Sequence, residues 1–179
     1  MRRECRLPVP DDLPEPVPPR DLVARYQPDL GRSARAYKDW VMSLDGLDPL
    51  TSEIVRLRCA RTHSCRLCQS LRWSDARDEG FDEAVDLAID RYEDSTLAER
   101  HKVALRLVDA YLTRPGAIDE KLAAEVRATF TPREIVELVL DLSKWSTQKV
   151  HVALRIDATD GERRYFTVDA DGALRYIAG

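Results

Sequence analysis

Two places in the chain carry the strongest local signal for the start of an α-helix, a capping side chain followed by proline. They are Asp48-Pro49 and Thr131-Pro132. The cap accepts a backbone N–H that has no partner inside the helix, and proline at the first helical position loses no hydrogen bond. Glu134 lies three residues after Thr131 and completes a capping box. These signals predict a domain built from helices.

Apolar side chains recur at helical spacing from residue 20 almost to the end of the chain. Thr96 and Glu99 form the pattern of another capping box, and Gly80 is a natural residue at which a helix ends. The predicted helices span about 49–62, 65–79, a short stretch after Asp82, 96–112 and 131–153. The predicted fold class is therefore all-α.

The two ends of the chain differ in pattern from this helical part. The runs RRYFTV and ALRYIA flank Asp169-Ala-Asp-Gly172, which predicts a β-hairpin that must pack on the helices or on another subunit. Near the other end, residues 7–19 hold six of the ten prolines, which favours an extended arm. That arm either covers the surface of its own subunit or lies across a neighbouring one. The predicted organisation is a proline-rich arm (1–20), a helical domain (21–158) and a hairpin extension (159–179).

A short pattern, E-I-V-x-L, occurs twice within the helical part. It begins at Glu53 and again at Glu134, an offset of 81 residues, and each copy lies near the start of a predicted helix. The two segments that follow end at Gly80 and Gly161. We therefore expect a duplicated helical unit, of which only the first copy carries cysteines.

Composition and charge exclude several classes of protein. The 179 residues are 44% hydrophobic and 34% charged, as in an ordinary globular domain, and the net charge of -4 comes from mixed signs. This pattern argues against a nucleic-acid-binding surface. The N-terminus has no apolar core of a secretory signal, and no apolar run has the roughly 20 residues needed to span a bilayer. We expect a cytoplasmic protein without membrane segments.

The main candidates for reactive or metal-binding residues are Cys65 and Cys68, which form a Cys-x-x-Cys motif. Structural disulfides are rare in a reducing compartment, so the motif is a redox pair, half of a zinc site or two buried packing thiols. Zinc would need two further ligands, and no second Cys-x-x-Cys is present. No β-strand is predicted before the motif, which disfavours a thioredoxin-like domain. We expect no metal and no cofactor, and we expect Cys59 to be a packing residue.

The neighbours of the pair suit a reactive thiol. The start of a helix and the positive charge of Arg72, four residues after Cys68, both favour a thiolate. Glu53, twelve residues before Cys65, is a candidate proton acceptor. His63 is the histidine nearest to the pair in sequence and a second candidate for moving protons. His101 and His151 could reach the pair only through tertiary folding.

The stretch LDPLTSEIVRLRCARTHSCRLCQSLR resembles the core of the alkyl hydroperoxidase D (AhpD) / carboxymuconolactone decarboxylase family, and the resemblance covers roughly residues 30–157. It implies an AhpD-like all-α fold assembled into trimers or hexamers. Carried over from the peroxidase branch, Cys68 would attack the peroxide, Cys65 would resolve the intermediate and Glu53 would belong to a proton relay. The reductant would be a dithiol such as a lipoyl-protein.

One position departs from that family. The relay histidine expected four residues after the second cysteine is Arg72 here, and arginine cannot shuttle protons. We therefore hold three hypotheses. The first is a thiol oxidoreductase that reduces a hydroperoxide or a small disulfide. The second is a non-redox lyase or isomerase with Glu53 as base and Arg72 binding a substrate carboxylate. The third is a catalytically silent oligomeric binding protein.

Overall fold

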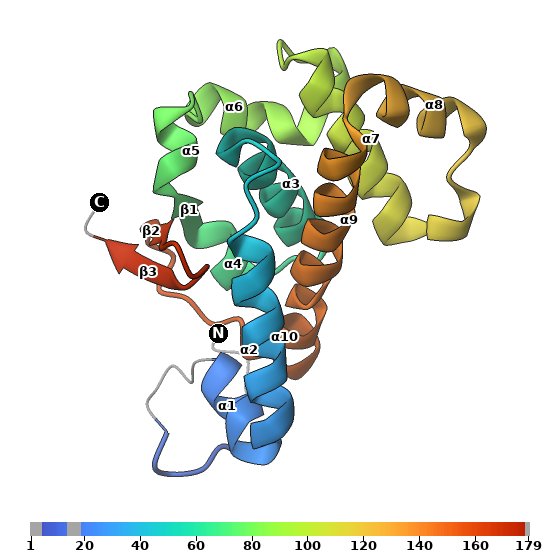
Figure 1. Ribbon diagram of the computed structural model, residues 1–179. Helices are drawn as coiled ribbons and strands as arrows, with labels where there is room; N and C mark the ends of the chain where they lie inside the picture. The colour runs from blue at the N-terminus through green and yellow to red at the C-terminus, as the bar shows by residue number, and fades with distance from the viewer. Residues whose placement is uncertain (1–4, 14–18, 178–179) are drawn as a thin grey trace.

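The computed structural model describes residues 5–13 and 19–177, and within them it is mainly helical with a small sheet (Figure 1). The predictions for residues 1–4, 14–18 and 178–179 lie outside this part. The helices are α1 (Pro19–Tyr26), α2 (Pro28–Met42), α3 (Pro49–Thr62), α4 (Arg66–Ser70), α5 (Ser74–Asp78), α6 (Glu83–Ala88), α7 (Glu99–Thr113), α8 (Glu120–Thr129), α9 (Pro132–Ser146) and α10 (Gln148–Leu154). Two 3₁₀ helices are η1 (Ile89–Asp94) and η2 (Pro115–Ala117), and the strands are β1 (Leu71–Trp73), β2 (Arg164–Val168) and β3 (Leu174–Ile177).

Helix α3 is the centre of the fold, with α7 and α9 packed against it (Figure 1). Seven consecutive α3 residues, 51–57, are buried, so every face of this helix is covered. Its apolar side chains divide among three clusters, one towards α7 and α9, one towards α5 and η1, and one in which Ala60 packs against Cys65 and Cys68. A helix buried all round can hold polar side chains only if they find partners inside the protein. That requirement applies to Glu53 and Arg56.

The strongest predicted helix starts are confirmed. Asp48 caps α3 by accepting the N–H of Thr51 at 2.7 Å. Thr131 and Glu134 form the predicted capping box at the start of α9. The capping box predicted at Thr96 is wrong, because α7 begins at residue 99 and its N-cap makes no side-chain hydrogen bond. The long helix predicted over 131–153 is also interrupted after residue 146 and resumes as α10.

The single helix predicted over 65–79 is wrong in a way that matters for the site. The chain turns through α4, becomes extended as β1, and turns again through α5. Residues 71–73 pair in parallel with β2, Leu71 opposite Arg164 and Trp73 opposite Phe166. Sheet pairing with a distant segment thus overrides the local helical pattern.

The predicted C-terminal hairpin is confirmed as β2 and β3, which pair antiparallel and complete a sheet of order β1-β2-β3. The hairpin packs on its own subunit through Phe166, which is 1% exposed and stacks on Trp73 with ring centroids 6.1 Å apart. Its turn abuts α2. Gly172 has a positive φ of 78°, and a Cβ there would collide with the backbone carbonyl of Asp39. The fold class is therefore mainly α, with a three-stranded sheet rather than an isolated hairpin.

The described part of the N-terminal arm lies on its own subunit. The backbone N–H of Arg6 donates to the carbonyl of Leu154 at 3.0 Å, and its guanidinium donates to the carbonyl of Ala153 at 2.9 Å. The hydroxyl of Tyr26 donates to the carbonyl of Pro8 at 2.6 Å. Residues 5–13 are thus attached to α10 and α1.

The predicted duplication stays a prediction. The two E-I-V-x-L copies occupy different places in their helices, because Glu53 is the fifth residue of α3 and Glu134 the third residue of α9. Glu53 is fully buried, whereas Glu134 closes a capping box and pairs with Arg100. The two copies of the pattern therefore have different structural roles in their helices.

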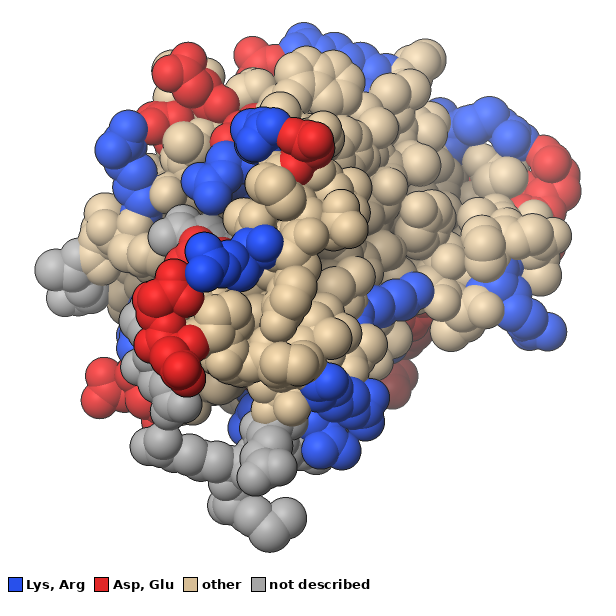
Figure 2. Space-filling view, turned by 90° about the horizontal axis from the view of Figure 1, so that it is seen from below, with Lys and Arg blue, Asp and Glu red and all other residues tan. Residues whose placement is uncertain are grey.

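The surface carries both signs of charge. On the face drawn in Figure 2, acidic and basic side chains lie near one another around a centre formed by uncharged residues. None of the helices in the described residues combines the length and the apolar character that crossing a membrane requires.

Phe166→Ala should lower the free energy of unfolding by about 3–5 kcal/mol, because it removes a buried aromatic ring that joins the hairpin to β1. Tyr176→Ala on β3 is the matched control, since that ring is 58% exposed and its loss should change stability by less than about 0.5 kcal/mol. Urea unfolding measures both. Equal losses in the two variants would mean that Phe166 does not anchor the hairpin.

Candidate functional site

Cys65 and Cys68 lie at the start of α4 and are joined by a disulfide, with their Cα atoms 5.3 Å apart. Cys65 is the N-cap of α4, and its sulfur accepts the backbone N–H of Cys68 at 3.3 Å. Cys65 is completely buried, whereas Cys68 is 7% exposed. The two sulfurs are therefore close enough for a disulfide within one turn of the chain, and Cys68 is the more accessible of the two residues.

Glu53 and Arg56 form a buried ion pair beside the cysteine turn. The guanidinium donates to both carboxylate oxygens, at 2.6 and 2.7 Å, and the exposed fractions of the two side chains are 0% and 2%. Glu53 also accepts the backbone N–H of Trp73 at 3.2 Å. Both oxygens of the carboxylate are thus engaged by donors inside the protein.

Arg56 extends this pair to the backbone of the cysteine turn. Its terminal nitrogens also donate to the carbonyls of Cys68 at 2.7 Å and Leu71 at 2.6 Å. Arg56 therefore fixes the end of α4 and the start of β1 against α3. Arg56 was not among the site residues predicted from the sequence, although its spacing of three from Glu53 is the spacing of an ion pair on a helix.

Arg72 lies on β1 and not on the helix that carries the cysteines. Its guanidinium donates to the carbonyls of Gln69 and Leu71 and to the carboxylate of Asp86, at 2.6, 2.8 and 2.9 Å. Burial lowers the pKa of this guanidinium, and the neighbouring carboxylate of Asp86 opposes that shift. In this arrangement Arg72 joins the segment after the cysteines to α6.

His63 follows α3 directly, and its ring faces α10. The Nδ1 atom lies 3.3 Å from the amide oxygen of Gln148. Burial lowers the pKa of His63, and the hydrogen bond with Gln148 partly offsets this effect. The structure places this candidate at the junction of α3 with α10.

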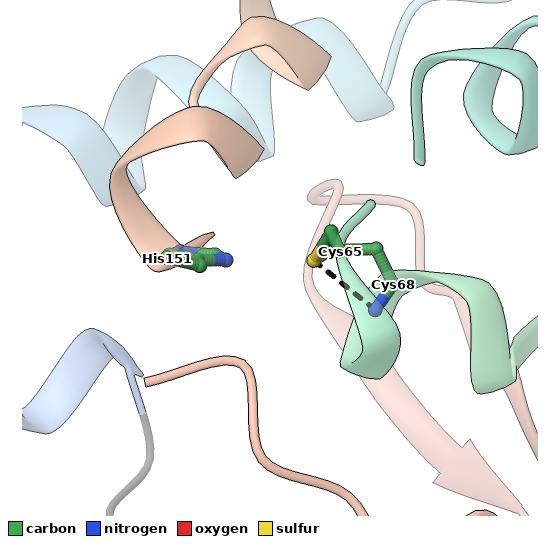
Figure 3. A group of neighbouring side chains, drawn as sticks. All are labelled: Cys65, Cys68 and His151. Carbon is green, nitrogen blue, oxygen red and sulfur yellow. Dashed lines mark hydrogen bonds between the residues drawn. A yellow bond between two sulfur atoms is a disulfide. The ribbon is translucent and has the colours of Figure 1, made fainter. Parts of the chain in front are cut away.

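The histidine that the structure brings to the cysteines is His151 on α10. One nitrogen of its ring and the two sulfurs all lie within 4.8 Å of one another. Figure 3 shows the ring extending from α10 towards Cys65. Burial lowers the pKa of His151, and the negative charge of Asp157 opposes the shift. No local sequence signal could have identified this residue, because 83 residues separate it from Cys68.

Cys65, Cys68 and His151 are also the residues that could hold a metal ion, by type and proximity. A structural zinc site uses four ligands and binds thiolates. This group supplies three ligand atoms, two of them in a disulfide, which is not a thiolate. In this disulfide form the group does not provide the ligands of a structural zinc site.

Cys59 differs from the pair and is confirmed as a packing residue. It is completely buried among apolar side chains of α3, α7 and α9. Burial raises the pKa of its thiol to about 12. A thiol with such a pKa stays protonated at neutral pH and is a poor nucleophile.

Comparison with known proteins places this geometry in a recognised fold. The chain is similar to a peroxidase-related protein of Ralstonia eutropha JMP134 with an alkylhydroperoxidase AhpD core (TM-score 0.68, 18% identity, 87% of this chain and 93% of that one). It is similar to ATU0492 of Agrobacterium tumefaciens, a protein of unknown function proposed to be the antioxidant defence protein AhpD (TM-score 0.64, 22% identity, 74% and 92%). The AhpD-like fold is therefore confirmed.

A third solved structure and two proteins of known sequence are also similar to this chain. The debrominase Bmp8, solved as a cysteine-to-alanine variant with 2,3,4-tribromopyrrole, shares the fold (TM-score 0.65, 14% identity, 78% of this chain and 75% of that one). Two uncharacterized proteins of Mycobacterium tuberculosis, MT2376 and Rv2313c, are 42% identical over 129 residues, which is 70% of this chain. The chain spans only 45% of the length of these relatives. No model of a known protein family matches the chain.

Arg56→Met should lower the free energy of unfolding by about 3–5 kcal/mol, because it leaves the Glu53 carboxylate buried without its partner. The double variant Glu53→Gln/Arg56→Met should lose less than the sum of the two single losses, since it removes both charges. Arg100→Met is the control, because its pair with Glu134 is partly exposed and should contribute less than about 1 kcal/mol. Additive losses in the urea unfolding of these variants would contradict the coupling.

Proposed function

We propose that this protein is a thiol-dependent oxidoreductase that uses Cys65 and Cys68 to reduce hydroperoxides or small disulfides. The observation that carries the proposal is the disulfide between these two residues at the start of α4, next to a histidine and inside an AhpD-like fold. Because proteins of one fold can catalyse different reactions, the site residues support this proposal more strongly than the similarity to AhpD-like structures does.

The proposed reaction with a hydroperoxide has two steps. The Cys68 thiolate attacks the terminal peroxide oxygen, the O–O bond breaks, and the alcohol leaves after taking up a proton. Cys68 is then a sulfenic acid. The sulfur of Cys65 attacks the sulfur of Cys68, the disulfide forms and water leaves. The two thiols lose two electrons, and the hydroperoxide gains them.

The difference in exposure between the two cysteines supports these roles. Cys68 is the residue that a peroxide can reach, whereas Cys65 is enclosed. When a dithiol reductant attacks Cys68 in the disulfide, Cys65 leaves as a thiolate. The N–H of Cys68 already points at that sulfur and stabilises the negative charge. We therefore assign Cys65 as the resolving residue.

Glu53 acts in this proposal as a positioning residue. Its carboxylate holds Arg56, which in turn holds the carbonyl of Cys68. The same engagement weakens the lyase alternative, in which Glu53 is a free base. Arg72 also counts against it, because both terminal nitrogens of its guanidinium already donate to protein oxygens.

The proposed surroundings follow from the chemistry. The disulfide must be re-reduced, so the protein needs a dithiol reductant, such as a lipoyl-protein, and a reducing compartment such as the cytoplasm. We propose no metal and no further cofactor for the reaction.

Treatment of the reduced protein with a slight excess of hydroperoxide should yield the Cys65–Cys68 disulfide, detected by mass spectrometry of the intact protein and its peptides. Cys68→Ser should abolish both the disulfide and the consumption of peroxide. Cys65→Ser should stop at a sulfenic acid, which a dimedone probe traps. Cys5→Ser is the control, because that cysteine is outside the pair, and it should behave as the wild type.

Other results of the same experiment would favour the alternatives. If both thiols stay reduced and peroxide is not consumed, the peroxidase proposal fails. Turnover of a lactone acid that survives in both cysteine variants but is lost in Glu53→Gln would favour the lyase. An absence of both activities would favour the silent binding protein.

We also propose a homo-oligomer, a trimer or hexamer as the resemblance implies. Trp40 on α2 and Val136 on the neighbouring helix α9 are more than half exposed, and burial of such side chains stabilises subunit contacts. Light scattering should give a mass of three or six subunits, and Trp40→Glu should reduce it. A monomer at micromolar concentration would contradict this proposal.

A further inference from the structure

The proposed reaction needs a group that takes the proton from the attacking thiol and returns it to the leaving alcohol. General acid–base help of this kind is typically worth about 10²–10⁴-fold in rate. A candidate must lie within reach of the sulfurs and must change its protonation state near neutral pH. These two requirements can be applied to each polar group around the cysteines.

Three neighbouring groups do not meet them. Arg72 remains protonated and is bound to Asp86. Glu53 directs both carboxylate oxygens at Arg56. His63 directs Nδ1 at Gln148, and its Nε2 is buried without a hydrogen-bond partner among the described residues, as is a ring nitrogen of His151. What separates the two histidines is distance, because the ring of His63 is not part of the cluster of ligand atoms around the two sulfurs.

His151 meets both requirements. Its ring nitrogen and the two sulfurs lie within 4.8 Å of one another, and Figure 3 shows the ring directed at the pair. The Nδ1 atom is buried and has no hydrogen-bond partner among the described residues. A buried ring nitrogen without a protein partner is uncommon, and such exceptions often mark functional groups.

We propose that His151 is the acid–base residue of this site, accepting the proton of the Cys68 thiol and returning it to the leaving alkoxide or hydroxide. The proposal rests on the dithiol chemistry proposed above and adds a residue from a different helix. In the first step the S–H bond breaks and an N–H bond forms, which leaves a thiolate beside an imidazolium. When the O–O bond breaks, the imidazolium gives that proton to the departing oxygen and becomes neutral again.

The electrostatic surroundings of His151 suit this cycle. Burial lowers the pKa of the ring, so the neutral form that accepts a proton prevails at neutral pH. The charged groups on this side include Asp157, which follows α10, and Arg66 on α4, whose guanidinium lies 3.3 Å from the Asp157 carboxylate. The guanidinium of Arg6, which donates to the carbonyl of Ala153, also lies at this end of α10. Asp157 favours the imidazolium once it forms, and its pair with Arg66 limits that effect.

The position is also fixed by the backbone. The carbonyl of His151 accepts the N–H of Ile156 at 2.9 Å, and the carbonyl of Asp157 accepts the N–H of Leu67 on α4 at 3.2 Å. The carboxylate of Asp157 accepts the backbone N–H of Arg66 at 3.1 Å. The end of α10 is thus tied to the cysteine turn, and this holds the ring near the sulfurs.

The test compares His151→Asn and His151→Gln with His101→Asn, a control on α7 whose ring is also partly buried and whose pKa is also lowered by burial. Two quantities are measured from pH 5 to 9, each with and without a chelator. They are the rate of hydroperoxide consumption and the rate of iodoacetamide alkylation of Cys68 in the reduced protein, resolved by peptide mass spectrometry. Circular dichroism confirms that each variant is folded.

We expect both His151 variants to lose about 10²-fold in peroxide consumption at neutral pH. Alkylation of Cys68 should shift towards the profile of an ordinary thiol, with a pKa of about 8.5, because the imidazolium no longer stabilises the thiolate. His101→Asn should keep both profiles of the wild type. An unchanged alkylation profile in folded His151 variants would overturn the inference.

The two readouts separate this inference from the proposed function. If the wild type does not consume peroxide but His151→Asn still shifts the alkylation profile, the peroxidase proposal fails and the acid–base role stands. If the wild type consumes peroxide and the His151 variants match it in both rates, the peroxidase proposal stands and the acid–base role of His151 fails. A shift in His63→Asn instead would assign the role to His63. A shift that disappears when the chelator is present would assign His151 to a bound metal.

Discussion

The arrangement of the site depends on the buried pair of Glu53 and Arg56. Burying two charges is costly, and such a pair adds little net stability compared with apolar residues of the same volume. What this pair provides is geometry, because Arg56 also donates to the carbonyls of Cys68 and Leu71. The short helix α4 and the strand β1 are thereby held against the central helix α3. The centroid of the Phe166 ring lies 5.7 Å from the same guanidinium, so the C-terminal hairpin also packs against Arg56.

Ion pairing inside the protein restricts what Glu53 and Arg72 can do in a reaction. A carboxylate that holds a guanidinium cannot at the same time be a free base, and an arginine that holds a carboxylate cannot grip a substrate. Both Glu53 and Arg72 are engaged in this way. In the proposed reaction, the group that moves the proton then lies outside α3 and β1. Helix α10 supplies the ring of His151, and the contacts of Asp157 tie that helix to the cysteine turn.

The sequence predicted those parts of the fold that local interactions determine. The caps at Asp48 and Thr131 depend on atoms within three residues, and both were identified. The C-terminal hairpin was predicted for the same reason. The break of the helix after Ser70 was not, because it results from pairing with β2, more than 90 residues later. The same distinction applies to the candidate site. Cys65, Cys68 and Glu53 could be predicted from their spacing within one segment. The position of His151 depends on how α10 packs, so it could not be predicted.

Cys59 and the cysteine pair have different surroundings, although the residue type is the same. Cys59 lies within α3 among apolar side chains, and burial raises the pKa of its thiol to about 12 because the loss of water outweighs the effect of the nearby cations. Cys65 is equally buried, but its sulfur lies at the start of α4, accepts a backbone N–H and has a histidine beside it. An anion on this sulfur therefore meets donors that are already in position. This difference in environment, over only six residues, supports the proposed redox role of the pair and leaves Cys59 as part of the core.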